Sequence, residues 1–250
     1  MRLYGLIGYP LGHSFSQKYF TEKFAREGIA GARFELFPLP DISGLPALIA
    51  AHPDLRGLSV TIPHKETVIA YLDELDETAR AVGAVNCVRI ENGRLTGFNT
   101  DATGFGQSLD MVDGGRWRVD GGKIALILGT GGASKAVAYV LKKRGIPFRF
   151  VSRNAEGENR ISYDDFHHLA PDSYCLIVNT TPLGTWPDVN NCPDVPFGQL
   201  TSKHLIYDLV YNPPETLLLQ RAKARGCTVK NGLEMLQLQA EAAWSIWQQT

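Results

Sequence analysis

The chain has 250 residues, which fit one large domain or two of modest size with a substantial buried core. Its composition, with 44% hydrophobic and 20% charged residues, is ordinary for a soluble globular protein. The 25 basic and 26 acidic side chains nearly cancel, so we expect neither a nucleic-acid partner nor a membrane surface. No apolar run approaches the roughly 18 residues that span a bilayer, and residues 1–10 lack the long apolar stretch of a signal peptide. We therefore expect a cytoplasmic protein.

The first hundred residues alternate strand-like and helix-like segments. Gly8-Tyr9-Pro10 turns the chain after a first apolar strand, and Asn92-Gly93 is a strong two-residue hairpin signal. We expect strands at residues 3–7, 33–38 and 58–61, helices at 16–27, 45–52 and 67–75, and hairpin strands at 85–90 and 95–98. This alternation indicates an α/β unit.

A second α/β unit begins near Thr103. Residues 123–128 form a continuous apolar run, which is typical of a strand buried on both faces of a parallel sheet. A glycine-rich loop and a helix to about Arg144 follow, and Gly145 closes that helix. Further strands are expected at 148–152, 175–179, 205–210 and near 228–229, with a last helix from about Leu233. The predicted fold class is α/β with two α/β domains.

The spacing after the strand at 148–152 is short. Ser152 and Cys175, in successive strands, are only 23 positions apart. Half of a doubly wound fold would place a helix, a strand and a helix between them. We therefore expect one element to be trimmed from this sheet.

The cysteines and histidines show no ligand pattern. Because the cysteines are scattered without a Cys-x-x-Cys pair, we expect reduced thiols rather than disulfides or zinc ligands at Cys87, Cys175, Cys192 and Cys227. The histidines are expected to be polar surface or loop residues, at positions 13, 52, 64, 167, 168 and 204. No metal site is predicted.

The loop Gly129-Thr-Gly-Gly-Ala-Ser134 lies between a strand and a helix. Backbone N–H groups and a positive helix end in such a loop can bind a pyrophosphate, and glycine lets phosphate oxygens approach the backbone. Ser134 stands at the third glycine position of the usual fingerprint. The context favours dinucleotide binding over a merely structural turn.

The end of the next strand distinguishes between two dinucleotides. NAD sites usually place Asp or Glu there to bind the ribose 2′-hydroxyl, whereas this chain has Ser152-Arg153-Asn154. Arginine and hydroxyl donors suit a 2′-phosphate, which a carboxylate would repel. NADP is therefore the expected cofactor, and the alternative is that Arg153 is simply a solvated strand-end residue.

Several polar residues of the first half are ambiguous when they are taken singly. Ser14 and Ser16 stand beside a helix start and could be helix caps. Lys65 follows a strand and a proline, where it could enter a cleft or remain in solvent. Asp101 and Asn99 follow another strand and are equally ambiguous.

Taken together and in order, these segments resemble the shikimate dehydrogenase family from end to end. The matching stretches are residues 8–16, 59–65, 83–86, 99–101, 129–134, 179–184, 208–213 and 232–239. The resemblance implies a substrate domain built from residues 1–102 plus 233–250, and a Rossmann-like NADP-binding domain at 103–232. It also implies NADP-dependent, reversible reduction of 3-dehydroshikimate to shikimate, in the pathway to chorismate and aromatic amino acids.

The resemblance also implies a role for each matching site residue. The matches to Ser14, Ser16 and Tyr211 hold the substrate carboxylate, and those to Thr61, Asn86, Asp101 and Gln239 bind the ring hydroxyls. The match to Lys65 is the catalytic acid/base, assisted by that to Asp101. The pyrophosphate is implied to lie against Gly129, Thr130, Gly131, Gly132 and Ala133, the 2′-phosphate against Ser152, Arg153 and Asn154, and the nicotinamide near the backbone of Leu209 and Gly232.

The chain departs from the family pattern at four positions. Gln17, Cys87 and Thr130 replace the usual proline, threonine and alanine. Gly157 stands where many NADP-dependent members have a second basic residue, a place that Arg160 could fill. The predicted preference for NADP is correspondingly weaker.

Three other functions remain as alternatives. A dehydrogenase of the same fold could prefer quinate or use NAD, and a catalytically silent relative could bind shikimate as a sensor. The sensor is disfavoured because Lys65 and Asp101 are both present. A scaffold module does not explain polar residues at so many strand ends. The expected partner is a small-molecule substrate, and the expected assembly is a monomer or homodimer.

Overall fold

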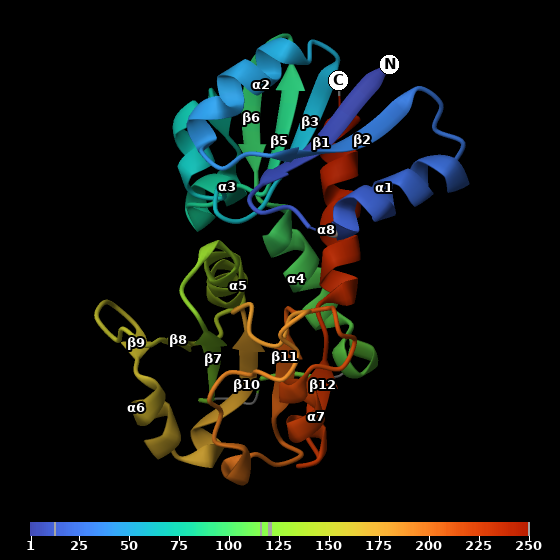
Figure 1. Cartoon of the computed structure of the whole chain (residues 1–250). Helices are drawn as coiled ribbons and strands as arrows, with labels where there is room; N and C mark the ends of the chain where they lie inside the picture. The colour runs from blue at the N-terminus through green and yellow to red at the C-terminus, as the bar shows by residue number, and fades with distance from the viewer. Residues whose placement is uncertain (13, 116, 120–121, 250) are drawn as a thin grey trace. The chain divides into compact units, whose positions relative to one another are not determined.

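The computed structural model describes residues 1–249 except 13, 116 and 120–121. The chain forms two compact units, which Figure 1 shows in one view. Unit 1 comprises Met1–Thr100 and Gln239–Thr250, and unit 2 comprises Asp101–Leu238. The first division lies two residues before the predicted one at 102/103. The second lies six residues after the predicted one at 232/233, inside the continuous helix α8 (Leu233–Trp247).

The six-stranded sheet of unit 1 is mixed and has the order β2-β1-β3-β5-β6-β4. Its strands are β1 (Arg2–Gly8), β2 (Ala32–Pro38), β3 (Leu55–Val60), β4 (Glu74–Leu75), β5 (Cys87–Glu91) and β6 (Arg94–Phe98). β1, β2 and β3 are parallel, and β5 pairs antiparallel with both β3 and β6. The carboxyl ends of β1, β3 and β6 therefore meet the start of β5 at one edge of the sheet.

Two apolar layers cover this sheet because successive side chains of β1 point to opposite faces. Leu3 and Ile7 pack with residues of α2 (Leu45–Ala51), while Tyr4 and Leu6 pack with α1 (Phe15–Arg26) and the end of α8. Trp247 of α8 lies so close to Gly57 that any added Cβ there would overlap its indole. The indole N–H donates to the carbonyl of Val88 at 3.0 Å.

The predicted helix at 67–75 is wrong. Residues Thr67–Tyr71 form one short 3₁₀ segment, β4 follows, and the helix in this region is α3 (Glu77–Val82). The backbone N–H of Asp73 donates to the carbonyl of Leu95 at 2.9 Å, and its carboxylate accepts from the Leu95 N–H at 2.7 Å. Pairing with β6 thus takes the backbone groups that a continuing helix would need.

The six-stranded sheet of unit 2 is entirely parallel, with the order β12-β11-β10-β7-β8-β9. Its strands are β7 (Ile124–Leu128), β8 (Phe148–Val151), β9 (Arg160–Ile161), β10 (Tyr174–Asn179), β11 (Leu205–Asp208) and β12 (Thr228–Lys230). The helices are α4 (Thr100–Asp110), which starts at the unit boundary and was not predicted, α5 (Gly132–Lys143), α6 (Tyr163–His168) and α7 (Leu217–Lys223). This strand order is that of a dinucleotide-binding doubly wound sheet.

The element that is missing from unit 2 is the helix expected after β8. Between Val151 and Arg160, where every residue is described, the chain forms only turns and bends, and β9 has shrunk to two residues. All six strands of the sheet are nevertheless retained. Gly145, which follows the C-cap residue Arg144 of α5, adopts a φ of +67°, as predicted for a glycine that closes this helix.

Two histidines are more buried than predicted. His64 lies in a turn and His204 directly precedes β11, but each is only 3% exposed. The ring of His64 donates to the carbonyl of Leu39 at 2.5 Å, and the ring of His204 lies 3.1 Å from the carbonyl of Pro171. His13 is outside the described residues. Along the part of the chain that is described, no helix is long and apolar enough to cross a membrane.

Candidate functional site

The carboxyl edge of the unit 1 sheet carries a hydrogen-bonded group of Asn86, Thr100 and Gln239. Asn86 directly precedes β5, and its side-chain oxygen accepts from the backbone N–H of Thr100 at 2.6 Å. Its amide nitrogen lies 2.9 Å from the Thr100 hydroxyl and 3.4 Å from the side-chain oxygen of Gln239. All three residues are at most 8% exposed. The orientation of both amides is therefore fixed, although Thr100 was not among the predicted site residues.

Lys65 lies in the turn that follows β3 at the same edge. Its backbone carbonyl accepts at 2.7 Å from the N–H of Val85, which is the residue before Asn86. Lys65 is half-buried. Thr61 begins this turn, and its backbone N–H donates to the carbonyl of Ile7 at 2.9 Å. A Cβ on Gly8 would overlap the methyl group of Thr61. The fold therefore brings Thr61, Lys65 and Asn86 to one edge of the sheet, because β3 ends where its antiparallel neighbour β5 begins.

Ser14 and Ser16 follow β1 at the amino terminus of α1. Ser14 is the N-cap, and its hydroxyl oxygen accepts from the N–H of Gln17 at 3.4 Å. Ser16 is inside the first turn and half-buried. Capping uses a lone pair of the Ser14 oxygen and leaves its O–H proton to donate. The first turn of α1 contains no acidic residue, so the helix end favours an anion such as a carboxylate.

Two predicted substrate-site residues belong to unit 2. Asp101 follows Thr100 in the first turn of α4 and is 7% exposed. Tyr211 follows β11 and is half-buried, and burial raises the pKa of its hydroxyl above the ordinary 10.0. At neutral pH Tyr211 is therefore a protonated donor, which suits an anionic ligand.

The glycine loop of unit 2 has the geometry of a phosphate site. Gly129 has a φ of +104°, a conformation that favours glycine, and Gly131 is the N-cap of the 12-residue helix α5 with no side-chain cap. A Cβ on Gly131 would meet nothing within 4 Å, so the space above the helix end is open. Ser134 is fully buried and its hydroxyl donates to the carbonyl of Gly131 at 2.6 Å. A small polar side chain thus replaces the third glycine without filling the loop, and Gly132 and Ala133 lie in the first helical turn.

The segment after β8 presents exposed donors. Arg153 and Asn154 are exposed, and the Ser152 hydroxyl oxygen accepts from the Asn154 N–H at 3.3 Å. Gly157 has a φ of +114°, and a Cβ there would lie 3.3 Å from Nε of Arg160. The Arg160 side chain therefore lies against the position where the family resemblance implies a second basic residue.

Leu209 and Gly232 meet at the carboxyl end of β11. A Cβ on Gly232 would overlap the carbonyl of Leu209, and the Gly232 N–H donates to the carbonyl of Val210 at 3.1 Å. Only glycine allows this approach. The two predicted nicotinamide neighbours are thus adjacent, and they lie at the same sheet edge as the glycine loop after β7 because β7 and β11 are both parallel to β10.

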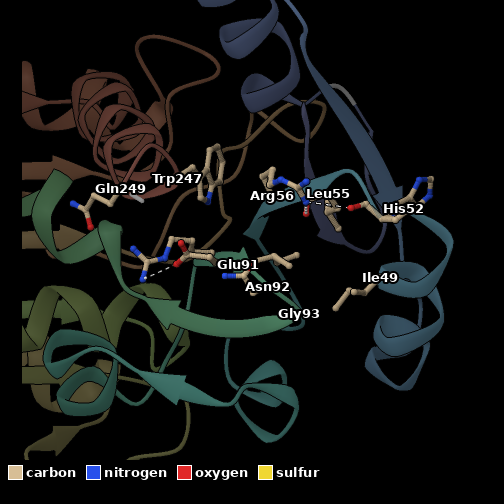
Figure 2. A pocket seen from close by; sticks show the side chains of 12 residues that line it. Ile49, His52, Leu55, Arg56, Glu91, Asn92, Gly93, Trp247 and Gln249 are labelled. Atoms are coloured by element: carbon tan, nitrogen blue, oxygen red, sulfur yellow. Dashed lines mark hydrogen bonds and ion pairs between the residues drawn. The ribbon is translucent and has the colours of Figure 1, made fainter. Parts of the chain in front are cut away.

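Unit 1 also contains a hollow of about 450 Å³ (Figure 2). It is formed by the end of α2, the start of β3, the β5–β6 turn and the end of α8, and its lining includes His52, Arg56, Asn92 and Trp247. These segments lie at the sheet edge opposite Thr61 and Asn86, because β3 starts there and β5 ends there. None of the predicted site residues, all of which are described, lines this hollow.

A glycine loop at a helix start and an edge of fixed polar side chains are the features that a dinucleotide-dependent oxidoreductase requires. A family model for the shikimate dehydrogenase substrate binding domain matches residues 6–88. The shikimate dehydrogenase (NADP(+)) of Carboxydothermus hydrogenoformans is 39% identical over 269 residues, which cover 98% of this chain and 91% of the relative.

Two solved structures are similar to this chain over nearly its whole length. The shikimate 5-dehydrogenase of Thermus thermophilus in complex with NADP(H) and shikimate is 31% identical with a TM-score of 0.84, covering 99% of this chain and 94% of that one. The shikimate 5-dehydrogenase of Listeria monocytogenes in complex with shikimate and NAD is 28% identical with a TM-score of 0.83, covering 98% and 91%. The chain belongs to the shikimate dehydrogenase family.

Proposed function

We propose that this protein catalyses the reversible, NADP-dependent reduction of 3-dehydroshikimate to shikimate. The observation that carries the proposal is the fixed pair of amides, Asn86 and Gln239, at the edge where the turn of Lys65 also lies. A ring with several hydroxyls needs hydrogen-bonding groups whose donor and acceptor ends do not exchange. Both amides meet that requirement, because Thr100 holds Asn86 at two points and the amide nitrogen of Asn86 donates to the side-chain oxygen of Gln239.

The carboxylate of the substrate is proposed to bind at the amino terminus of α1. The hydroxyls of Ser14 and Ser16 donate to it there, and the protonated hydroxyl of Tyr211 adds a third donor. An anion bound by neutral hydroxyls gains less than it would from arginine, but the helix end adds a favourable field. Thr61, Asn86, Asp101 and Gln239 are proposed to bind the ring hydroxyls.

Lys65 is the proposed acid/base of the reaction. When a hydride reaches a carbonyl carbon, negative charge develops on the carbonyl oxygen, and an ammonium group can stabilise and then protonate that oxygen. Asp101 is proposed to orient the lysine and the neighbouring hydroxyl. In the reverse direction the neutral amine of Lys65 takes the hydroxyl proton. NADPH supplies the hydride, and the protein supplies position and charge.

The dinucleotide is proposed to bind along the carboxyl edge of the unit 2 sheet. The pyrophosphate fits the open space at Gly131 and the uncapped start of α5, against residues 129–133. The 2′-phosphate is proposed to meet Ser152, Arg153 and Asn154, which are solvent-accessible donors after β8. The nicotinamide is proposed to lie near Leu209 and Gly232.

One assay tests the proposed function. Purified protein should oxidise NADPH when 3-dehydroshikimate is added, as followed by the loss of nicotinamide absorbance. The same assay with NADH, and the reverse assay with quinate and shikimate, separate the alternatives. No turnover with any of these pairs would refute the proposal and favour a protein that only binds the ring acid.

The second candidate function is a dehydrogenase that also accepts NAD. The observation in its favour is Gly157, which removes a basic side chain from the predicted phosphate site. Arg160, which lies against Gly157, is proposed to compensate in part. Comparable rates with NADH and NADPH would favour this second function.

We also propose a cytoplasmic location and a monomeric or homodimeric state. Light scattering tests the assembly.

A further inference from the structure

The end of β11 carries a buried carboxylate that the proposed chemistry does not use. Asp208 has no exposed surface. Its Oδ1 accepts from the amide of Asn179 at 2.9 Å and from the N–H of Val210 at 3.0 Å, and its Oδ2 accepts from the hydroxyl of Thr216 at 2.6 Å. Burial raises the pKa of this carboxyl, although the three hydrogen bonds oppose the rise. Within the described residues these donors are all neutral, so the carboxylate depends on their geometry.

This carboxylate joins three elements of unit 2. Asn179 is the last residue of β10, and its side-chain oxygen accepts from the N–H and the hydroxyl of Thr181 at 3.0 and 2.7 Å. Thr216 is the N-cap of α7. Asp208 therefore fixes the ends of two neighbouring strands, which Figure 1 labels β10 and β11, together with the start of a helix.

The segments proposed to bind the dinucleotide contact the strand ends that Asp208 holds. On one side, the hydroxyl of Thr180 donates to the carbonyl of Leu128 at 2.6 Å, and a Cβ on Gly129 would lie 2.9 Å from that hydroxyl. On the other side, the N–H of Leu209 donates to the carbonyl of Asn179 at 3.0 Å, while the Leu209 carbonyl lies against Gly232. A shift of β10 relative to β11 would therefore move the Leu209–Gly232 contact.

We propose that Asp208 is a positioning residue for the nicotinamide end of the dinucleotide, an inference that rests on the proposed function. Its carboxylate, bound by Asn179, Val210 and Thr216, sets where the backbone of Leu209 and Gly232 meets the nicotinamide. The proposed 2′-phosphate site is not held by Asp208. Arg153 follows β8, which is separated from β11 by β7 and β10.

The experiment compares two ligands that share the adenosine end. Both contain adenosine and its 2′-phosphate, but only NADP has a nicotinamide, which adenosine 2′,5′-bisphosphate lacks. In Asp208→Asn, which preserves shape but removes charge, NADP affinity measured by calorimetry should fall about tenfold, the effect of about one hydrogen bond that the nicotinamide loses when the backbone of Leu209 and Gly232 moves. Affinity for adenosine 2′,5′-bisphosphate should stay within about twofold, since Arg153 keeps its place.

A second pair of variants tests the Oδ2 atom of Asp208 without changing the carboxylate itself. Thr216→Val removes the hydroxyl with little change in shape, and Thr216→Ser restores it. The NADP to bisphosphate affinity ratio should drop in the valine variant and return in the serine variant. Ser162→Ala is the matched control, because it removes the N-cap of α6 elsewhere in unit 2. It should leave both affinities unchanged.

The outcomes separate the two proposals. Equal loss of both ligands, or loss of neither, in Asp208→Asn and Thr216→Val would overturn the positioning role. Should Asp208→Asn fail to fold by circular dichroism, the Thr216→Val and Thr216→Ser pair decides. A wild-type protein that binds NADP without reducing 3-dehydroshikimate would refute the proposed reaction, while the binding ratio would still test Asp208.

Discussion

The polar groups at the two sheet edges are held in different ways. In unit 1, Asn86, Thr100 and Gln239 are almost fully buried and bond to one another. In unit 2, Arg153 and Asn154 stand exposed after β8, and the open loop at Gly131 leaves backbone N–H groups to bind the ligand.

The difference indicates two modes of recognition. Buried side chains with fixed orientation can reject a substrate whose hydroxyls are misplaced, because an unmatched buried polar group is costly. An exposed arginine binds a phosphate mainly by charge, which solvent and salt screen. We therefore expect substrate specificity to be sharp and cofactor specificity to be graded. The following variants test that contrast.

The largest expected effect is the loss of turnover in Lys65→Met. Without the ammonium group, the developing oxyanion is neither stabilised nor protonated, so kcat should fall by roughly 10²-fold or more. The KM for 3-dehydroshikimate should change much less, because the lysine acts on transition-state charge. Steady-state kinetics measure both constants. Lys18→Met, at a lysine whose side chain is 78% exposed, is the control. Near-normal kcat in folded Lys65→Met would remove Lys65 from the mechanism.

Arg153→Ala should weaken cofactor binding and not catalysis in general. Hydrogen bonds to charged groups contribute roughly 1.5–3 kcal/mol, so NADP affinity should fall about 10- to 100-fold. NAD has no 2′-phosphate and should be nearly unaffected. Because Gly157 removes the usual second basic group, Arg153 should carry most of this discrimination by itself.

Salt provides an independent measure of the same contact. NADP affinity of the wild-type protein should decline with ionic strength, and the decline should flatten in Arg153→Ala, since an exposed ion pair is screened. Arg225→Ala, at an exposed arginine elsewhere in unit 2, serves as control. If Arg153→Ala weakens NADP and NAD equally, the cofactor assignment is wrong.

The serines at α1 test whether substrate binding can be separated from helix capping. Ser14→Ala and Ser16→Ala should each weaken shikimate binding by about 1–2 kcal/mol in calorimetry without changing NADP affinity. Only Ser14→Ala should also destabilise the fold, by about 1 kcal/mol, because only Ser14 caps the helix.

Ser14→Asp sharpens this test. Aspartate is a good N-cap, so stability should be retained, but its charge would repel the carboxylate of shikimate. A double Ser14→Ala, Ser16→Ala variant that binds shikimate normally would mean that these residues serve only the helix.

Strong local signals predicted most of the fold. The Asn92-Gly93 hairpin, the apolar strand β7 with its glycine loop, and the closing Gly145 were each set by neighbouring residues. The helix predicted at 67–75 failed because its backbone groups pair with β6, a contact distant in sequence. Helix α4 was missed because Gly104 and Gly106 disfavour a helix locally. In the structure the carbonyl of Gly106 accepts from Arg144 at 2.6 Å, which sequence spacing does not reveal.

Some candidate site residues could be proposed from their place after a predicted strand, as Lys65 and Asp101 were. Thr61 and Asn86 were named only through the family resemblance, and the sheet order explains why Thr61, Lys65 and Asn86 lie at one edge. The supporting contacts were not predictable. Thr100 bonds to side chains that are 14 and 139 positions away, and Asp208 bonds to side chains that are 8 and 29 positions away. Such pairings depend on register between strands, which a single sequence does not specify.

The smallest expected effect concerns Glu234, in the unit 2 part of α8. Its carboxylate accepts from the hydroxyl of Ser108 at 2.8 Å and from the ammonium of Lys230 at 2.5 Å. Partial burial acts to raise the pKa of this carboxyl, but the hydrogen bonds from Lys230 and Ser108 outweigh it and hold the pKa below 4.5. Because the folded pKa is lowered, the ionised carboxylate stabilises the protein above pH 4.5, and this stabilisation is lost as the pH falls through the folded-state value.

Glu234→Gln should keep the bond from Ser108 and lose the ion pair with Lys230. Since the glutamate side chain is 39% exposed, the cost at neutral pH should be less than about 1 kcal/mol. Urea unfolding of both proteins at pH 7 and at about pH 3.5 measures the difference, which should shrink at the lower pH. Glu158→Gln, at an exposed position of the same unit, should show no difference at either pH. A cost for Glu234→Gln that is equal at both pH values would mean that Glu234 acts through packing, and that its charge contributes nothing to the stability of unit 2.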